Sequence, residues 1–189
     1  DNRPHLSAAM LAAQALGAVP VPLYQDAVAA EFVYPLNFAE VAFAVVENQE
    51  QVDKMLEVRE QCPQLAHIWF DDPRGLRKYE EPGLSSLETL CQAGDAWMTQ
   101  HPGFFDTEVA RTQPHDVAAM FFTSGTTGEA KATMHFHRDL LIIADGYAKE
   151  VLAVTPDDVF VGSPPLAFTF GLGGLAVFPL RFGAAATLL

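Results

Sequence analysis

The residues best suited to chemistry form a short run of glycines and hydroxyl side chains that ends at a lysine. Residues 118–140 read AAMFFTSGTTGEAKATMHFHRDL, so an apolar stretch leads directly into this run. Gly125 and Gly128 can adopt positive φ and let the backbone approach a ligand closely. Backbone N–H groups exposed in such a turn point at phosphate oxygens. The pattern therefore predicts an anion-binding loop.

Four hydroxyls and one ammonium group add to this predicted loop. The hydroxyls belong to Thr123, Ser124, Thr126 and Thr127. They can donate to phosphate oxygens or reach a magnesium ion, while Lys131 adds a point charge. The spacing differs from the GxxxxGK[ST] loop of the common NTPases, because Lys131 stands three residues after Gly128. A simple Ser/Thr/Gly turn without a ligand is the alternative for this stretch.

Apolar strands and helix-forming segments alternate around the loop. Helices are expected at residues 6–16, 27–38, 49–59, 85–98 and 138–152. Strands are expected at residues 18–23, 41–46, 67–70, 117–123, 159–162 and 184–189, and loops at 71–83 and 99–114. This alternation predicts a single α/β domain, with a mostly parallel sheet and flanking helices.

Local signals define several of these boundaries. Gly17 is expected to end the first helix, and Asp26 is expected to cap the second. Ser85 and Glu88 have the spacing of a capping box. The almost wholly apolar stretch 41–46 (VAFAVV) is typical of a strand covered on both faces.

Composition excludes several classes of protein. Half of the 189 residues are hydrophobic, and the net charge is −13. The sequence shows no basic patch of the kind that nucleic-acid-binding proteins carry. The two cysteines, Cys62 and Cys91, form no CxxC pair, which indicates a reduced, cytoplasmic protein; no secretory leader is recognisable. Residues 159–180 lack charge, but prolines and glycines interrupt them, so no transmembrane segment is expected.

Other polar residues have simpler interpretations. His135 and His137 form an HxH pair that lacks a third zinc ligand nearby. The acidic pairs 71–72 and 157–158 adjoin prolines, which favours turn and capping roles. Ser124 has no GxSxG setting, so a hydrolase nucleophile is not expected.

The stretch TSGTTGEAK resembles the signature phosphate loop of the adenylate-forming superfamily, TSGTTG-x-PK-G. Ala130 and Ala132 replace the usual Pro and Gly, but neither change removes a donor. The resemblance extends over residues 1–189 and implies part of the large N-terminal domain of such an enzyme, with the C-terminal lid domain absent.

The resemblance implies an acyl-CoA synthetase that uses ATP, Mg²⁺ and CoA and forms an acyl-adenylate. Its phosphate-binding residues would be Thr123, Ser124, Gly125, Thr126, Thr127, Gly128 and Lys131. Thr126 and Lys131 would act in catalysis, and Thr126 or Thr127 would contact the metal. The motifs SPPLAFTFG and MHFHRDL place Phe168 and His137 in the carboxylic acid pocket.

The two parts of the chain resemble different relatives. Residues 14–122 are similar to long-chain fatty acyl-CoA synthetases, and residues 131–189 to benzoate or 2-aminobenzoate CoA ligases. A recombined gene and an intermediate family are both hypotheses for this change, and the acid stays open between fatty and aromatic.

Later family motifs for adenine, ribose and the adenylation step do not occur before Leu189. We therefore expect these 189 residues alone to be inactive and to expose apolar surface. Two alternatives remain: a non-catalytic nucleotide-binding remnant or subunit that needs the missing part in trans, and an unrelated phosphate-binding module.

Overall fold

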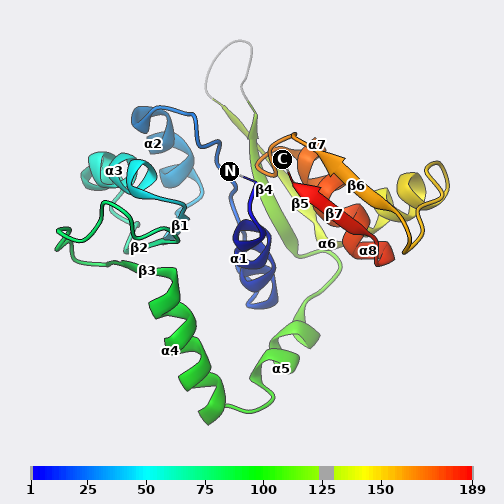
Figure 1. Ribbon diagram of the computed structural model, residues 1–189, viewed down its shortest axis with the longest axis horizontal. Coiled ribbons are helices and arrows are strands. Elements are labelled where there is room, and N and C mark those ends of the chain that lie inside the picture. The colour runs from blue at the N-terminus through cyan, green and yellow to red at the C-terminus, as the bar shows by residue number, and fades with distance from the viewer. Residues whose placement is uncertain (1, 124–129, 189) are drawn as a thin grey trace. The chain divides into compact units, whose positions relative to one another are not determined.

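Residues 2–123 and 130–188 are described by a computed structural model in which strands and helices alternate along the chain (Figure 1). Contacts divide the chain into two units. One combines Asp1–Tyr24 with Phe105–Leu189, and the other is Gln25–Phe104. Parallel strand pairs predominate, so the predicted α/β class is confirmed. The assignment of residues 1–189 to one partial domain stays a prediction.

The unit Gln25–Phe104 contains a parallel sheet with the strand order β1-β2-β3. The strands are β1 (Phe43–Val46), β2 (His67–Phe70) and β3 (Leu84–Ser86). The helices are α2 (Ala29–Phe38), α3 (Gln49–Val58), the short 3₁₀-helix η1 (Arg59–Gln61) and α4 (Leu87–Gln100).

Helix α3 forms where its sequence predicts it. The Asn48 side chain accepts a hydrogen bond from the Gln51 backbone N–H at 3.3 Å, which caps the first turn. Val52, Met55 and Val58 follow helical spacing and are buried. This apolar stripe explains why α3 packs against α2 and β2.

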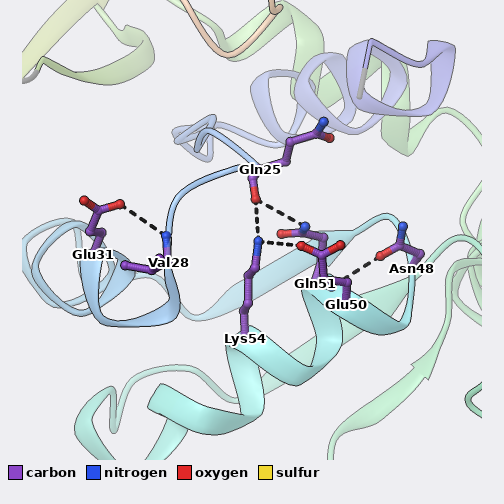
Figure 2. Close-up of polar contacts among 7 residues, drawn as sticks. All are labelled: Gln25, Val28, Glu31, Asn48, Glu50, Gln51 and Lys54. Carbon is purple, nitrogen blue, oxygen red and sulfur yellow. Dashed lines mark hydrogen bonds and ion pairs between the residues drawn. The ribbon is translucent and has the colours of Figure 1, made fainter.

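The start of this unit is tied to α3 through one carbonyl group. The Gln25 carbonyl oxygen accepts hydrogen bonds from Lys54 Nζ at 2.7 Å and Gln51 Nε2 at 3.3 Å (Figure 2). Lys54 also pairs with Glu50 one helical turn away, at 2.9 Å. These contacts hold Gln25, the first residue of the unit, against α3.

The other unit contains α1 and the elements from α5 onward. Its strands are β4 (Val117–Thr123), β5 (Lys131–Phe136), β6 (Val159–Gly162) and β7 (Ala185–Leu188). Strands β4 and β5 pair antiparallel, whereas β6 and β7 pair parallel. The helices are α1 (Pro4–Ala15), α6 (His137–Ile143), π-helix η2 (Ala144–Lys149), α7 (Thr169–Leu172), π-helix η3 (Gly173–Val177) and α8 (Phe178–Phe182). Helix α5 (Phe104–Arg111) begins at the boundary between the units.

Two adjoining apolar clusters form the core of this unit. The larger one joins α1, β4, the turn before α7 and the helices that follow. Its buried members are Met10, Ala119, Phe121, Leu166, Leu172, Leu175 and Ala176. The smaller one consists of Ala144, Ala148 and Phe178. Residues far apart in sequence therefore meet around β4, the strand that precedes the predicted phosphate loop.

Two predicted strands differ from the structure by more than one residue at an end. Residues 18–23 form no strand because Pro20 and Pro22 have no backbone N–H, although the Pro20 carbonyl accepts from Met120 N of β4 at 3.0 Å. Residues 41–46 were expected to be covered on both faces. Strand β1 begins only at Phe43, whose exposed fraction is 62%, so this expectation was wrong.

Several helices have other boundaries than predicted, and the first of them, α1, covers Pro4–Ala15 and not 6–16. Helix α2 begins after Val28, and Glu31 accepts from the Val28 N–H at 3.2 Å, so Asp26 is not its cap. Ser86 caps α4 in place of the predicted Ser85, which belongs to β3. The predicted loop 99–114 contains α5, an amphipathic helix with no buried residue.

The last predicted helix, 138–152, starts one residue earlier in the structure and changes from an α-helix to a π-helix. It begins at His137 as α6 and continues as the π-helix η2, which ends at Lys149. The expected exposure of apolar side chains is also observed on α6 and β6. Large exposed residues there include Leu141, Ile142, Ile143, Val159 and Val161. No helix among the described residues has the length and apolar character needed to cross a bilayer.

Candidate functional site

The ends of the predicted phosphate loop lie at the turn end of the β4–β5 hairpin, where β4 ends and β5 begins. Thr123, the last residue of β4, pairs with Lys131, the first residue of β5. The Thr123 hydroxyl donates to the Lys131 carbonyl oxygen at 3.3 Å, and both residues are exposed. Ser124, Gly125, Thr126, Thr127 and Gly128, which complete the predicted site, lie outside the described residues. Strand pairing therefore closes the base of the loop.

The hairpin below the loop is held by contacts on one face. In an antiparallel pair, residues opposite one another point to the same side. Phe121 is buried in the core, and its carbonyl accepts from the opposite Thr133 hydroxyl at 3.1 Å. The His135 ring meets Phe121 edge to face, with 5.5 Å between centroids. These contacts anchor the two strands that carry Thr123 and Lys131.

The charge at the hairpin end suits an anion. Among residues 2–123 and 130–188, no carboxylate forms an ion pair with the Lys131 ammonium group. An exposed lysine without such a partner is hydrated and can interact with an anion.

His137 lies at the other end of β5, as the first residue of α6. Its backbone N–H donates to the Asp116 carbonyl at 3.1 Å, and the ring is half-buried. His135 Nε2 lies 3.5 Å from the Thr133 hydroxyl. Within the described part of the chain, no three His, Cys, Asp or Glu side chains gather as metal ligands. The acidic pairs take local roles instead: Asp72 accepts from Arg74 N and Asp158 from Thr155 N.

Phe168 lies immediately before α7, with an exposed fraction of 44%. Its ring centroid is 5.3 Å from that of Tyr24, at an interplanar angle of 36°. Its backbone N–H donates to the Pro165 carbonyl at 3.0 Å, which closes a turn. Sequence reasoning missed Tyr24, because no local pattern indicates that it meets a residue so far along the chain.

Comparison with known proteins matches the whole chain to one family. The model of the family described as AMP-binding enzyme matches residues 1–189. The benzoate–CoA ligase of Thauera aromatica is 30% identical over 173 residues, which cover 92% of this chain and 29% of that protein. The medium-chain fatty-acid–CoA ligase of Escherichia coli K12 is 32% identical, covering 95% and 30%. The human long-chain-fatty-acid–CoA ligase 6 is 27% identical, covering 90% and 25%.

Aromatic and fatty acid relatives thus each match about nine tenths of the chain, and neither resemblance is confined to one part.

Solved structures have the same fold. The anthranilate CoA ligase AuaEII, crystallised with anthranoyl-AMP, superposes with a TM-score of 0.74 at 23% identity, covering 95% of this chain and 32% of that one. A benzoate CoA ligase from Burkholderia xenovorans gives 0.68 at 23% identity, covering 98% and 32%. The chain spans about three tenths of the length of these relatives.

Proposed function

Because the chain belongs to the family of AMP-binding enzymes, we propose that it holds the phosphates of ATP in an ATP-dependent carboxylic acid:CoA ligase. In the first step, a carboxylate oxygen attacks the α-phosphorus of ATP, and the bond to the β-phosphate breaks. Acyl-adenylate and pyrophosphate form. In the second step, the thiolate of CoA attacks the acyl carbon, and AMP leaves.

The observation that carries this proposal is the Thr123–Lys131 pair at the end of the β4–β5 hairpin. The paired strands hold the loop ends together, so no further entropy is lost in bringing these ends together when a phosphate binds. The Lys131 ammonium group stabilises negative charge on the β- and γ-phosphates, and more strongly so as pyrophosphate departs. Ser124, Gly125, Thr126, Thr127 and Gly128 complete the proposed phosphate site.

Magnesium belongs to this proposal as the counter-ion of the phosphates, whose negative charge it neutralises. Thr126 and Thr127 are the hydroxyls proposed to contact it. Threonine hydroxyl oxygens carry lone pairs, and oxygen ligands are those that magnesium prefers.

The acid is proposed to bind near Phe168, with His137 as a second pocket residue. The half-exposed Phe168 ring, packed on Tyr24, offers an apolar surface for either an aromatic ring or an alkyl chain. The proposed substrate class is therefore a carboxylic acid, aromatic or fatty.

A second proposal is a non-catalytic nucleotide-binding protein, or a subunit that needs the remaining part in trans. It rests on the same Thr123–Lys131 pair at the end of the hairpin, which supports nucleotide binding but does not by itself supply the chemical step. Under this proposal the hairpin binds ATP, but no acyl-adenylate forms.

Acid-dependent exchange of labelled pyrophosphate into ATP tests both proposals. The natural protein that carries this sequence is assayed with benzoate, 2-aminobenzoate, octanoate and palmitate, and ATP binding is measured in parallel. Exchange with at least one acid supports the ligase. ATP binding with no exchange on a broad acid panel supports the second proposal, and failure to bind ATP contradicts both.

A further inference from the structure

We infer that Asn2 is a positioning residue for the acid site, because its side chain fixes the turn that presents Phe168. This inference rests on the proposed ligase function. Asn2 precedes α1, whereas the turn covers residues 164–168 near the other end of the chain. Two side-chain hydrogen bonds connect them. Asn2 Nδ2 donates to the Pro164 carbonyl at 3.0 Å, and Asn2 Oδ1 accepts from the Leu166 N–H at 2.8 Å.

The composition of the turn explains why it needs such a partner. Pro164 and Pro165 have no backbone N–H, so the first amide that the turn can use after them belongs to Leu166. Asparagine carries one acceptor and two donors at the end of a short side chain. It therefore satisfies an N–H and a carbonyl of the same turn together, which an aspartate cannot do.

Packing below the turn leaves it little freedom to move. The Leu166 side chain is 1% exposed and lies in the cluster that contains Met10 of α1. An added Cβ at Gly171 would lie only 2.1 Å from the Pro165 carbonyl oxygen, so α7 touches the turn at this point. The turn is thus enclosed by Asn2, the core and α7.

The position of the turn determines the position of Phe168, the exposed aromatic residue at its end. The Phe168 N–H donates to the Pro165 carbonyl, and the Phe168 carbonyl accepts from Leu172 N of α7. A shift of the turn therefore changes where the Phe168 ring stands beside Tyr24. Asn2 is not among the residues proposed to contact ATP or the acid, and in this inference it acts only through the placement of this ring. We expect its loss to weaken acid binding and to leave ATP binding unchanged.

The test compares Asn2→Ala and Asn2→Asp with Gln14→Ala in the natural protein. Gln14 is a matched control, because its Nε2 makes a similar long-range bond, to the Ala118 carbonyl at 2.7 Å, away from the turn. Hydrogen exchange by mass spectrometry follows the Leu166 amide. Pyrophosphate exchange gives KM separately for the acid and for ATP.

For Asn2→Ala, we expect faster Leu166 exchange and an acid KM raised about tenfold, with the ATP KM unchanged within about twofold. Asn2→Asp keeps the acceptor for Leu166 and loses the donor to Pro164, so its effect should be intermediate. Gln14→Ala should change neither quantity.

Unchanged Leu166 exchange in Asn2→Ala would overturn the structural part of the inference. Faster exchange with an unchanged acid KM, or equal rises in both KM values, would overturn the positioning role. If Asn2→Ala does not fold, Asn2→Asp decides by the same two measurements. A wild-type protein without acid-dependent exchange would instead contradict the proposed ligase function, and the inference would fail with it.

Discussion

Thr123 and Lys131 are paired across the β4–β5 hairpin, and the Thr123 hydroxyl donates to the Lys131 carbonyl oxygen at 3.3 Å. The two ends of the glycine-rich motif are therefore neighbours in space. Strand pairing orders both residues before any ligand arrives, so the loop that joins them begins and ends at fixed points. The closure of the loop ends is therefore already provided by folding.

Replacement of Lys131 by alanine should reduce pyrophosphate exchange in the natural protein by about 100-fold, because one positive group is lost from the developing charge. Lys131→Arg keeps the charge and should retain part of the activity. Lys149→Ala is the matched control, since Lys149 is exposed on the same unit and pairs with Glu150 at 3.6 Å. Similar losses in the Lys131 and Lys149 alanine variants would contradict the assignment of Lys131 to the phosphate site.

Replacement of Gly171 by alanine should destabilise the fold by about 2 kcal/mol or more, as steric overpacking does. The new Cβ would lie 2.1 Å from the Pro165 carbonyl oxygen, and backbone atoms cannot swing away. Gly174→Ala is the control, because no atom lies within 4 Å of its added Cβ. Urea unfolding should show a lower midpoint for Gly171→Ala and an equal or higher midpoint for Gly174→Ala. A Gly171→Ala midpoint equal to that of the wild type would show that the turn is not closely packed.

The sequence predicted elements well where apolar runs end at clear turn signals. Strands β2 and β4 have the predicted bounds, and α3 differs by one residue at its C-terminal end. In α3 the buried Val52, Met55 and Val58 give a strong helical period. In β4 the buried Phe121 belongs to an apolar run that stops at the glycine-rich motif.

Other features depend on contacts between residues far apart in sequence, which a local sequence pattern cannot predict. Strand β5 (KATMHF) was missed, because its register comes from pairing with β4 and its own residues alternate weakly. The phosphate motif was recognised, but its place on an antiparallel hairpin was not. The bonds from Asn2 to Pro164 and Leu166 join opposite ends of the chain, and only tertiary structure shows them.

The two cysteines should differ strongly in reactivity. Cys62 is 2% exposed, and burial raises the pKa of its thiol, so less thiolate is present at neutral pH. Cys91 lies exposed on α4. With a thiol-specific disulfide reagent at pH 8, and with labelling followed at each cysteine by peptide mass spectrometry, we expect fast reaction at Cys91. Reaction at Cys62 should be about 100-fold slower or occur only after unfolding. Labelling of Cys62 as fast as that of Cys91 would mean that Cys62 is accessible.

Asp145 should make stability depend on acid pH. Arg181 donates to both carboxylate oxygens of Asp145, Nε to Oδ1 and Nη2 to Oδ2, each at 3.0 Å. These hydrogen bonds hold the pKa of Asp145 below its ordinary value of 3.8. A lowered folded-state pKa means that the stabilisation is fully present above that ordinary value, and is lost as pH falls through the lowered pKa.

Asp145→Asn should therefore lower the unfolding midpoint at pH 7, and the difference from the wild type should shrink as the pH falls below 3.8. Asp157→Asn is the control, because Asp157 is exposed and forms no ion pair within the described chain. Thermal unfolding between pH 7 and pH 2 measures both differences. A difference for Asp145→Asn that stays constant over this range would contradict the ion pair.

The start of α4 allows a test of which serine, Ser86 or Ser85, caps the helix. Ser86 Oγ accepts from the Thr89 N–H at 3.1 Å, whereas the adjacent Ser85 belongs to β3 and pairs with Trp69 of β2. No residue of α4 is buried, so its stability depends more on capping than on packing. Ser86→Ala should destabilise the helix by about 1 kcal/mol, and Ser85→Ala should destabilise it less. Amide exchange at Thr89 should accelerate in Ser86→Ala and not in Ser85→Ala. The reverse pattern would place the cap at Ser85, where the sequence alone predicts it.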